Sequence, residues 1–141
     1  MLAVKSNEEV SASDSSSQNH QVQHNTKTLS GPSLRAFTKI VKLWKLDIED
    51  AMVLLGEKSV ELYKSWLREP EYALLSETQI KRISYLLSIH NAAQQYLTNG
   101  TPPHKWLRKK NNDFIFQGKT PLEYLLKGEM DQLHSLLFYL T

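Results

Sequence analysis

Signals that begin and end α-helices recur along this chain and divide most of it into short segments. Asp47, Ser59 and Ser76 each stand before a run of apolar residues at helical spacing. A side-chain oxygen at that place caps the first turn of a helix. Gly56 and Gly128 follow two of the runs, where glycine commonly ends a helix. No segment has the alternating pattern of a half-buried strand. The sequence therefore predicts an all-α fold with about six or seven helices.

The first 31 residues differ from the rest in composition. They consist mainly of Ser, Asn, Gln and His with isolated valines, so they bury too little apolar surface to offset the entropy lost on ordering. We therefore expect residues 1–31 to be a disordered tail. The tail lacks the apolar core of a signal peptide, and no stretch approaches the roughly 20 apolar residues that cross a bilayer. With no cysteine in the chain, the expectation is a cytoplasmic protein without membrane contact.

Residues 32–98 contain a pattern that is typical of a helix-turn-helix. Two short predicted helices meet at a turn that contains Gly56. The candidate DNA contacts are basic or polar residues on the second of these helices, together with a basic strip on the helix that precedes both of them: Arg35, Lys39, Lys42, Lys58, Ser59, Lys64 and Arg68. Such a strip is also the ordinary solvated side of a core helix, and Glu57 and Glu61 would face phosphate unfavourably.

The C-terminal segment is a pair of short helices with many leucines. Thr120, Pro121 and Glu123 form a capping-box pattern with proline at the first helical position, and a second amphipathic run follows Gly128. That second run carries apolar residues on more than one side: Met130, Leu133, Leu136, Leu137, Phe138, Tyr139 and Leu140. Two interpretations remain open. Either a small domain needs them all for its core, or some of them form a helix-in-groove contact with a partner.

The sequence lacks the motifs of an enzyme. The five histidines share no metal-ligand spacing, and no glycine-rich phosphate loop or nucleophile elbow is present. Ser59 and Ser76 are explained as helix caps. We therefore expect a binding protein that holds no cofactor and no metal.

Three strings carry a resemblance to a known family: "LRAFTKIVKLWKLDIEDAMVLLG", "LSETQIKRISYLLSIHNAAQQYL" and "HKWLRKKNNDFIFQGKTPLEYLLKGEMDQLHSLLFYL". Residues 33–140 resemble the Xre/MbcA/ParS antitoxins, which pair with RES-domain toxins. The most specific part is an ordered string: Trp106-Leu107-Arg108, Asn111, an aromatic residue before Gly118, and then Thr120-Pro121-Leu122-Glu123. The chain departs from the family at Lys110, where the family usually has proline, and at Met52 and Glu57 in the helix-turn-helix.

The resemblance implies a division of labour. Residues 32–98 would be a helix-turn-helix domain that dimerises and binds promoter DNA, and residues 99–141 would be a domain that blocks the active-site entrance of an NAD-consuming RES toxin. The antitoxin would be a homodimer within a toxin–antitoxin hetero-oligomer. The toxin contacts would be Trp106, Arg108, Met130, Leu133, Leu136, Leu137, Phe138, Tyr139, Leu140 and the terminal Thr141. The alternative is a free-standing helix-turn-helix transcriptional regulator without a toxin partner.

Overall fold

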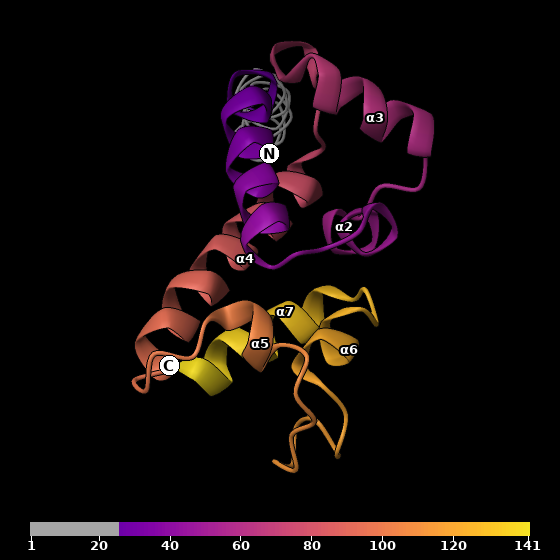
Figure 1. Cartoon of the computed structure of the whole chain (residues 1–141). Coiled ribbons are helices and arrows are strands. Elements are labelled where there is room, and N and C mark those ends of the chain that lie inside the picture. Colours follow the sequence, from indigo (N-terminus) through magenta and orange to yellow (C-terminus); the bar gives the residue numbers. More distant parts are fainter. Residues whose placement is uncertain (1–25) are drawn as a thin grey trace, which may run out of the picture.

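Residues 26–141 form an all-helical fold in the computed structural model, and no strand occurs among these described residues (Figure 1). The first helix is described over 26–43. The elements after it are α2 (Ile48–Leu55), α3 (Val60–Arg68), the 3-10 helix η1 (Pro70–Tyr72), α4 (Glu77–Tyr96), α5 (Pro103–Trp106), α6 (Pro121–Leu125) and α7 (Met130–Leu140). The prediction of an all-α fold is confirmed.

Helix α4 connects two groups of elements. The first helix, α2 and α3 form the upper group in Figure 1, and α5, α6 and α7 form the lower group, in which α7 packs along α4. Among α2 to α7, the pair α4 and α7 forms the most extensive contact. A 20-residue helix spans about 30 Å, so α4 is long enough to serve both groups.

The first helix begins earlier than its composition suggests. Residues 26–31, which the sequence assigns to the tail, are helical, and Ser30 is fully buried. The Ser30 hydroxyl accepts a hydrogen bond from the backbone N–H of Leu75 at 2.9 Å. Because a buried serine satisfied by a distant backbone group has no apolar signature, the pattern underestimates this helix. The rest of the predicted tail, residues 1–25, lies outside the described residues.

The predicted helix caps are present. The side chains of Asp47, Ser59 and Ser76 accept hydrogen bonds from backbone N–H groups of their own first turns, and Gln79 completes a capping box with Ser76. Thr120 accepts from the N–H of Glu123 at 3.0 Å, with proline at the first helical position. Each cap satisfies a backbone donor that the helix leaves unpaired, and contributes about 1 kcal/mol.

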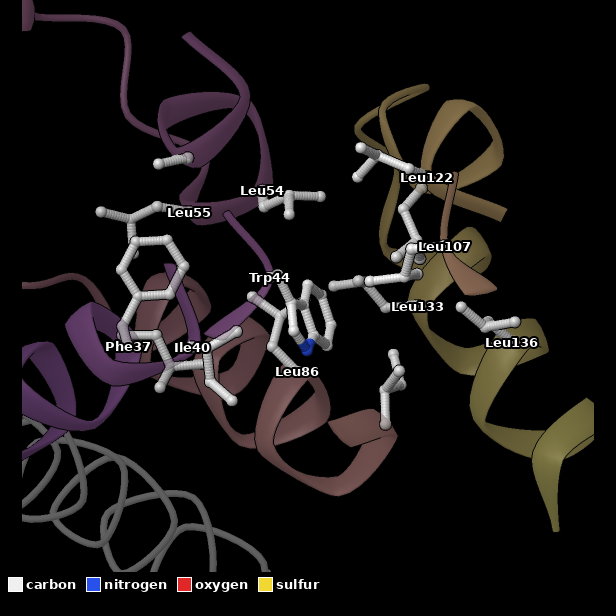
Figure 2. Close-up of a cluster of buried hydrophobic side chains, with 14 of the residues drawn as sticks. Phe37, Ile40, Trp44, Leu54, Leu55, Leu86, Leu107, Leu122, Leu133 and Leu136 are labelled. Atoms are coloured by element: carbon white, nitrogen blue, oxygen red, sulfur yellow. The ribbon is translucent and has the colours of Figure 1, made fainter. Parts of the chain in front are cut away.

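One hydrophobic core runs through the described chain. Figure 2 shows the ring of Trp44 near Leu54 and Leu86, with Leu107 and Leu133 from the C-terminal part facing it. All five side chains are buried. The indole N–H of Trp44 donates to Nδ1 of His90 at 2.9 Å, which satisfies the one polar atom of that ring. The core therefore continues across the predicted boundary between residues 98 and 99.

Candidate protein-binding surface beside helix α7

An aromatic cluster supports the C-terminal surface. Phe116 lies at its centre, and its ring centroid is 6.0 Å from that of Trp106, 5.7 Å from that of Tyr124 and 5.1 Å from that of Tyr139. The ring planes are nearly perpendicular in all three pairs, which is a favoured edge-to-face arrangement. The cluster joins α5, α6 and α7 to the loop that carries Phe116.

The loop 111–119 is closed by its own hydrogen bonds. The N–H of Asn111 donates to the carbonyl of Lys119 at 3.0 Å, and the N–H of Gly118 donates back to the carbonyl of Asn111 at 3.0 Å. The side chain of Asn111 also accepts from the N–H of Asp113 at 2.9 Å. Gly118 has φ 80°, a left-handed conformation that glycine adopts without strain. These contacts give a structural reason for the Asn111 to Gly118 spacing.

Two phenylalanines stand out from this supported region. Phe114 is 91% exposed and Phe138 is 79% exposed. Beside Phe138 is a hollow of about 620 Å³, also lined by Ile115, His134, Ser135 and Tyr139. Single exposed apolar residues are ordinary, but large aromatic residues beside an apolar hollow are typical of an interaction site. Phe138 and the hollow define the candidate site, which is called the Phe138 surface below, and Phe114 precedes one of its lining residues, Ile115, in sequence.

Tyr139 forms a fixed wall of the hollow. Its hydroxyl donates to the carboxylate of Asp113, and the hydroxyl of Tyr96 lies 3.2 Å away. Burial, together with the hydrogen bonds to Asp113 and Tyr96, raises the pKa of Tyr139 above its ordinary value. The phenol therefore stays neutral at physiological pH and keeps donating to Asp113. Because these contacts restrict the rotamer, a partner would meet a pre-organised surface.

The structure narrows the predicted toxin-contact set. Leu133, Leu136 and Leu140 are buried in the protein's own core, so they are unavailable to a partner in the folded chain. α7 turns these leucines toward the interior because they recur at spacings of three and four residues, while Phe138 lies off that stripe. These three leucines therefore agree with the interpretation that the small domain needs them for its own core.

The remaining members of that set lie in different environments. Phe138 and Tyr139 line the hollow, and Thr141 is exposed at the chain end. Met130 and Leu137 are partly buried against the core, and Trp106 packs in the aromatic cluster. Arg108 donates to the backbone carbonyls of His104 at 3.0 Å and Lys45 at 2.7 Å. Its guanidinium therefore joins α5 to the end of the first helix.

Four residues were not predicted from the sequence: the exposed Phe114 and three residues that line the hollow, Ile115, His134 and Ser135. A signal for the first two was available, because "NNDFIFQG" places three apolar residues inside a polar loop. Only Phe116 of the three is buried. The sequence does not indicate that His134 and Ser135 line the hollow, because this depends on which side of α7 faces the loop.

The predicted DNA contacts come from two elements, the first helix and α3 with the residues beside it. Ser59 caps α3, and Lys58, Lys64 and Arg68 are exposed on or beside that helix. Arg35, Lys39 and Lys42 are exposed on the first helix. The surface at α3 also exposes Leu62, Tyr72 and Leu74 around a hollow of about 520 Å³. The α3 surface therefore mixes apolar and charged side chains.

Residues 26–141 offer neither a metal site nor a membrane-spanning helix. No group of three or more His, Asp or Glu side chains there is placed to hold a metal ion. None of the helices in that range has both the length and the apolar composition needed to cross a bilayer.

Comparison with known proteins gives one distant relative. A protein of Sinorhizobium fredii (strain NBRC 101917 / NGR234), described as "Uncharacterized protein y4oB", is 28% identical over 107 residues, which is 76% of this chain and 80% of that protein. No protein-family model matches the chain, and no solved structure does.

Proposed function

We propose that this chain is a type II antitoxin that binds a RES-domain, NAD-consuming toxin through the Phe138 surface and blocks its active site. The observation that carries the proposal is the highly exposed Phe138 beside an apolar hollow, where the lining residue Tyr139 packs on the ring of Phe116 and the exposed Phe114 is next in sequence to the lining residue Ile115. The resemblance of residues 33–140 to the Xre/MbcA/ParS antitoxins supplies the class of partner. In that family the C-terminal segment closes the entrance to the toxin's active site, and the antitoxin does no chemistry.

We also propose that the chain forms a homodimer and binds the promoter of its own operon. The exposed Tyr72 and Leu74 beside α3 support a dimer contact through the N-terminal helices. The turn at Gly56, with Ser59 capping the next helix, favours the second candidate function, a helix-turn-helix regulator without a toxin partner. The two candidates differ in whether the product of a neighbouring gene is toxic and is neutralised by this chain.

The experiment co-expresses the chain with that neighbouring gene product and scores growth rescue and co-purification. We expect the full chain to rescue growth. Phe138→Ala and Phe114→Ala should each weaken the complex at least tenfold, because aromatic anchors at interface centres cost about 2 kcal/mol or more when truncated. Both side chains are exposed, so the melting temperature of the free protein should not change.

Tyr72→Ala is the matched control, since it truncates a similarly exposed aromatic residue on a different surface. It should leave rescue intact and should shift the chain toward the monomer in sedimentation. If Tyr72→Ala abolishes rescue and Phe138→Ala does not, the partner binds at α3 and the assignment of the Phe138 surface is wrong. A harmless neighbouring product would favour the free-standing regulator.

A further inference from the structure

A trough runs along the first helix, between it and the elements α4 and α5. It consists of two hollows of about 450 and 630 Å³, and both hollows are lined by Leu43 and His90. Because they share these residues, the hollows adjoin. The floor includes apolar side chains such as Leu87 and Leu97.

Positive charges line the rim of this trough. Arg35, Lys39 and Lys42 follow one another at intervals of about one turn of the first helix, and Lys45 lies in the turn just after that helix. Arg35 and Lys42 are seven residues apart, which corresponds to about 10 Å along the helix. No Asp or Glu lines either hollow, so the charged side chains of the lining are all basic.

The row of cations continues onto α5. Arg108, two residues after α5, is held against the turn that follows the first helix by its hydrogen bond to the carbonyl of Lys45, and Lys105 is exposed on α5. Desolvation, and then the charges of Lys45, Lys105 and Arg108, lower the pKa of His104. These cations therefore lie within electrostatic reach of one another, although they come from both halves of the sequence.

The N-terminus of α3 is electrostatically different. Glu57 accepts hydrogen bonds from the backbone N–H groups of Lys58 and Ser59, both at 3.0 Å, and from the side chain of Gln79 at 3.1 Å. A carboxylate is therefore fixed at the start of α3. In a helix-turn-helix, the N-terminal residues of the second helix contact the bases, and a fixed negative charge there opposes the approach of phosphate.

We propose that the phosphate backbone of nucleic acid lies along the trough, on Arg35, Lys39, Lys42, Lys45, Lys105 and Arg108, instead of crossing the N-terminus of α3. Three cations at helical spacing over about 10 Å, continued by Lys45 in the next turn, suit a strand of phosphates better than a single anion. The inference deepens the DNA-binding half of the proposed function and is independent of toxin binding.

The test compares two triple variants of the full chain: Arg35→Gln/Lys39→Gln/Lys42→Gln and Lys58→Gln/Lys64→Gln/Arg68→Gln. Each removes one arginine and two lysines, and all six side chains are exposed. The probe is a labelled 20-bp duplex from the chain's own promoter, titrated between 50 and 200 mM salt. The first variant, called the trough triple, should lower the slope of log K for DNA binding against log salt by about 2 to 3, because each lost phosphate contact removes about 0.9. The second variant, called the α3 triple, should leave this slope unchanged.

Lys105→Gln tests the α5 end and should lower the slope by about one. An equal or larger effect of the α3 triple would overturn the proposal, as would an absence of duplex binding by the unaltered chain at 50 mM salt. Preference for a poly-glutamate chain over the duplex at equal ionic strength would assign the trough to an acidic protein instead. The trough triple should still neutralise the toxin, so failure here is distinguishable from failure at the Phe138 surface.

Discussion

At the scale of single residues, two glycines provide a matched pair. Gly56 and Gly100 have φ of 77° and 80°, so alanine is strained at either position by about 1–2 kcal/mol. A Cβ at Gly56 would also lie 3.0 Å from Nε of Arg82, whereas nothing lies within 4 Å at Gly100. Arg82 donates to the carbonyls of Leu54 and Gly128. Gly56→Ala should therefore cost roughly 1 kcal/mol more than Gly100→Ala in urea denaturation, because it disturbs these bonds. Equal losses would mean that Arg82 is not fixed.

His90 should make stability depend on pH. Burial lowers the pKa of His90 below its ordinary value, and its Nδ1 accepts from Trp44, which requires that nitrogen to be unprotonated. The unfolded chain takes up the proton at about pH 6.5. Neutral His90 therefore contributes fully to the free energy of unfolding above about pH 6.5. This contribution is lost as the pH falls below about 6.5 toward the lower pKa that His90 has in the folded chain.

The measurement is the free energy of unfolding at pH 7.5 and pH 5.5 for the parent chain and for His90→Gln. Glutamine can still accept a hydrogen bond but does not titrate in this range, so the loss on acidification should be smaller in this variant. His134→Gln, at an exposed position, is the control and should lose as much as the parent. A parent chain that is equally stable at both pH values would contradict the assignment.

At the scale of elements, α7 is part of the core. Removing residues 136–141 deletes Leu136, which is fully buried, and Leu140, which is 8% exposed. The sequence alone favours an N-terminal module that survives this truncation, but the contact of α7 with α4 argues against it. Each lost leucine should cost about 2–5 kcal/mol, so we expect the truncated chain to melt well below the parent in circular dichroism. Phe138→Ala should melt with the parent, and an unchanged melt of the truncated chain would place α7 outside the core.

Element boundaries were predictable because caps act locally, and the sequence places Asp47, Ser59, Ser76 and Thr120 directly before their helices. The inward face of α7 was not predictable, since apolar residues occupy several of its sides and packing on α4 selects Leu133, Leu136 and Leu140. The Phe138 surface could not be predicted either, because it depends on which face of α7 packs on α4. The trough could not be predicted because Lys45 and Arg108 are far apart in sequence and come together only in the fold.

At the scale of the whole molecule, residues 26–141 share one core. Trp44 packs with leucines from both predicted domains, Arg82 bonds to Gly128, and Arg108 bonds to Lys45. A domain that unfolds separately would have to expose this shared surface. We therefore expect a single cooperative transition in urea, with coincident curves from circular dichroism and tryptophan fluorescence.

The sharper test of this prediction is the fragment 26–98, which retains the first helix and α2 to α4 but loses α5 to α7. The buried side chains of Trp44, Leu86 and Ile89 would keep only part of their packing. Loss of one large buried partner already costs several kcal/mol, against a total stability of about 5–15 kcal/mol, so the fragment should lack a cooperative melt. The fragment 26–141 is the control and should melt like the full chain. If 26–98 shows dispersed amide signals and a sharp transition, the N-terminal helices fold independently.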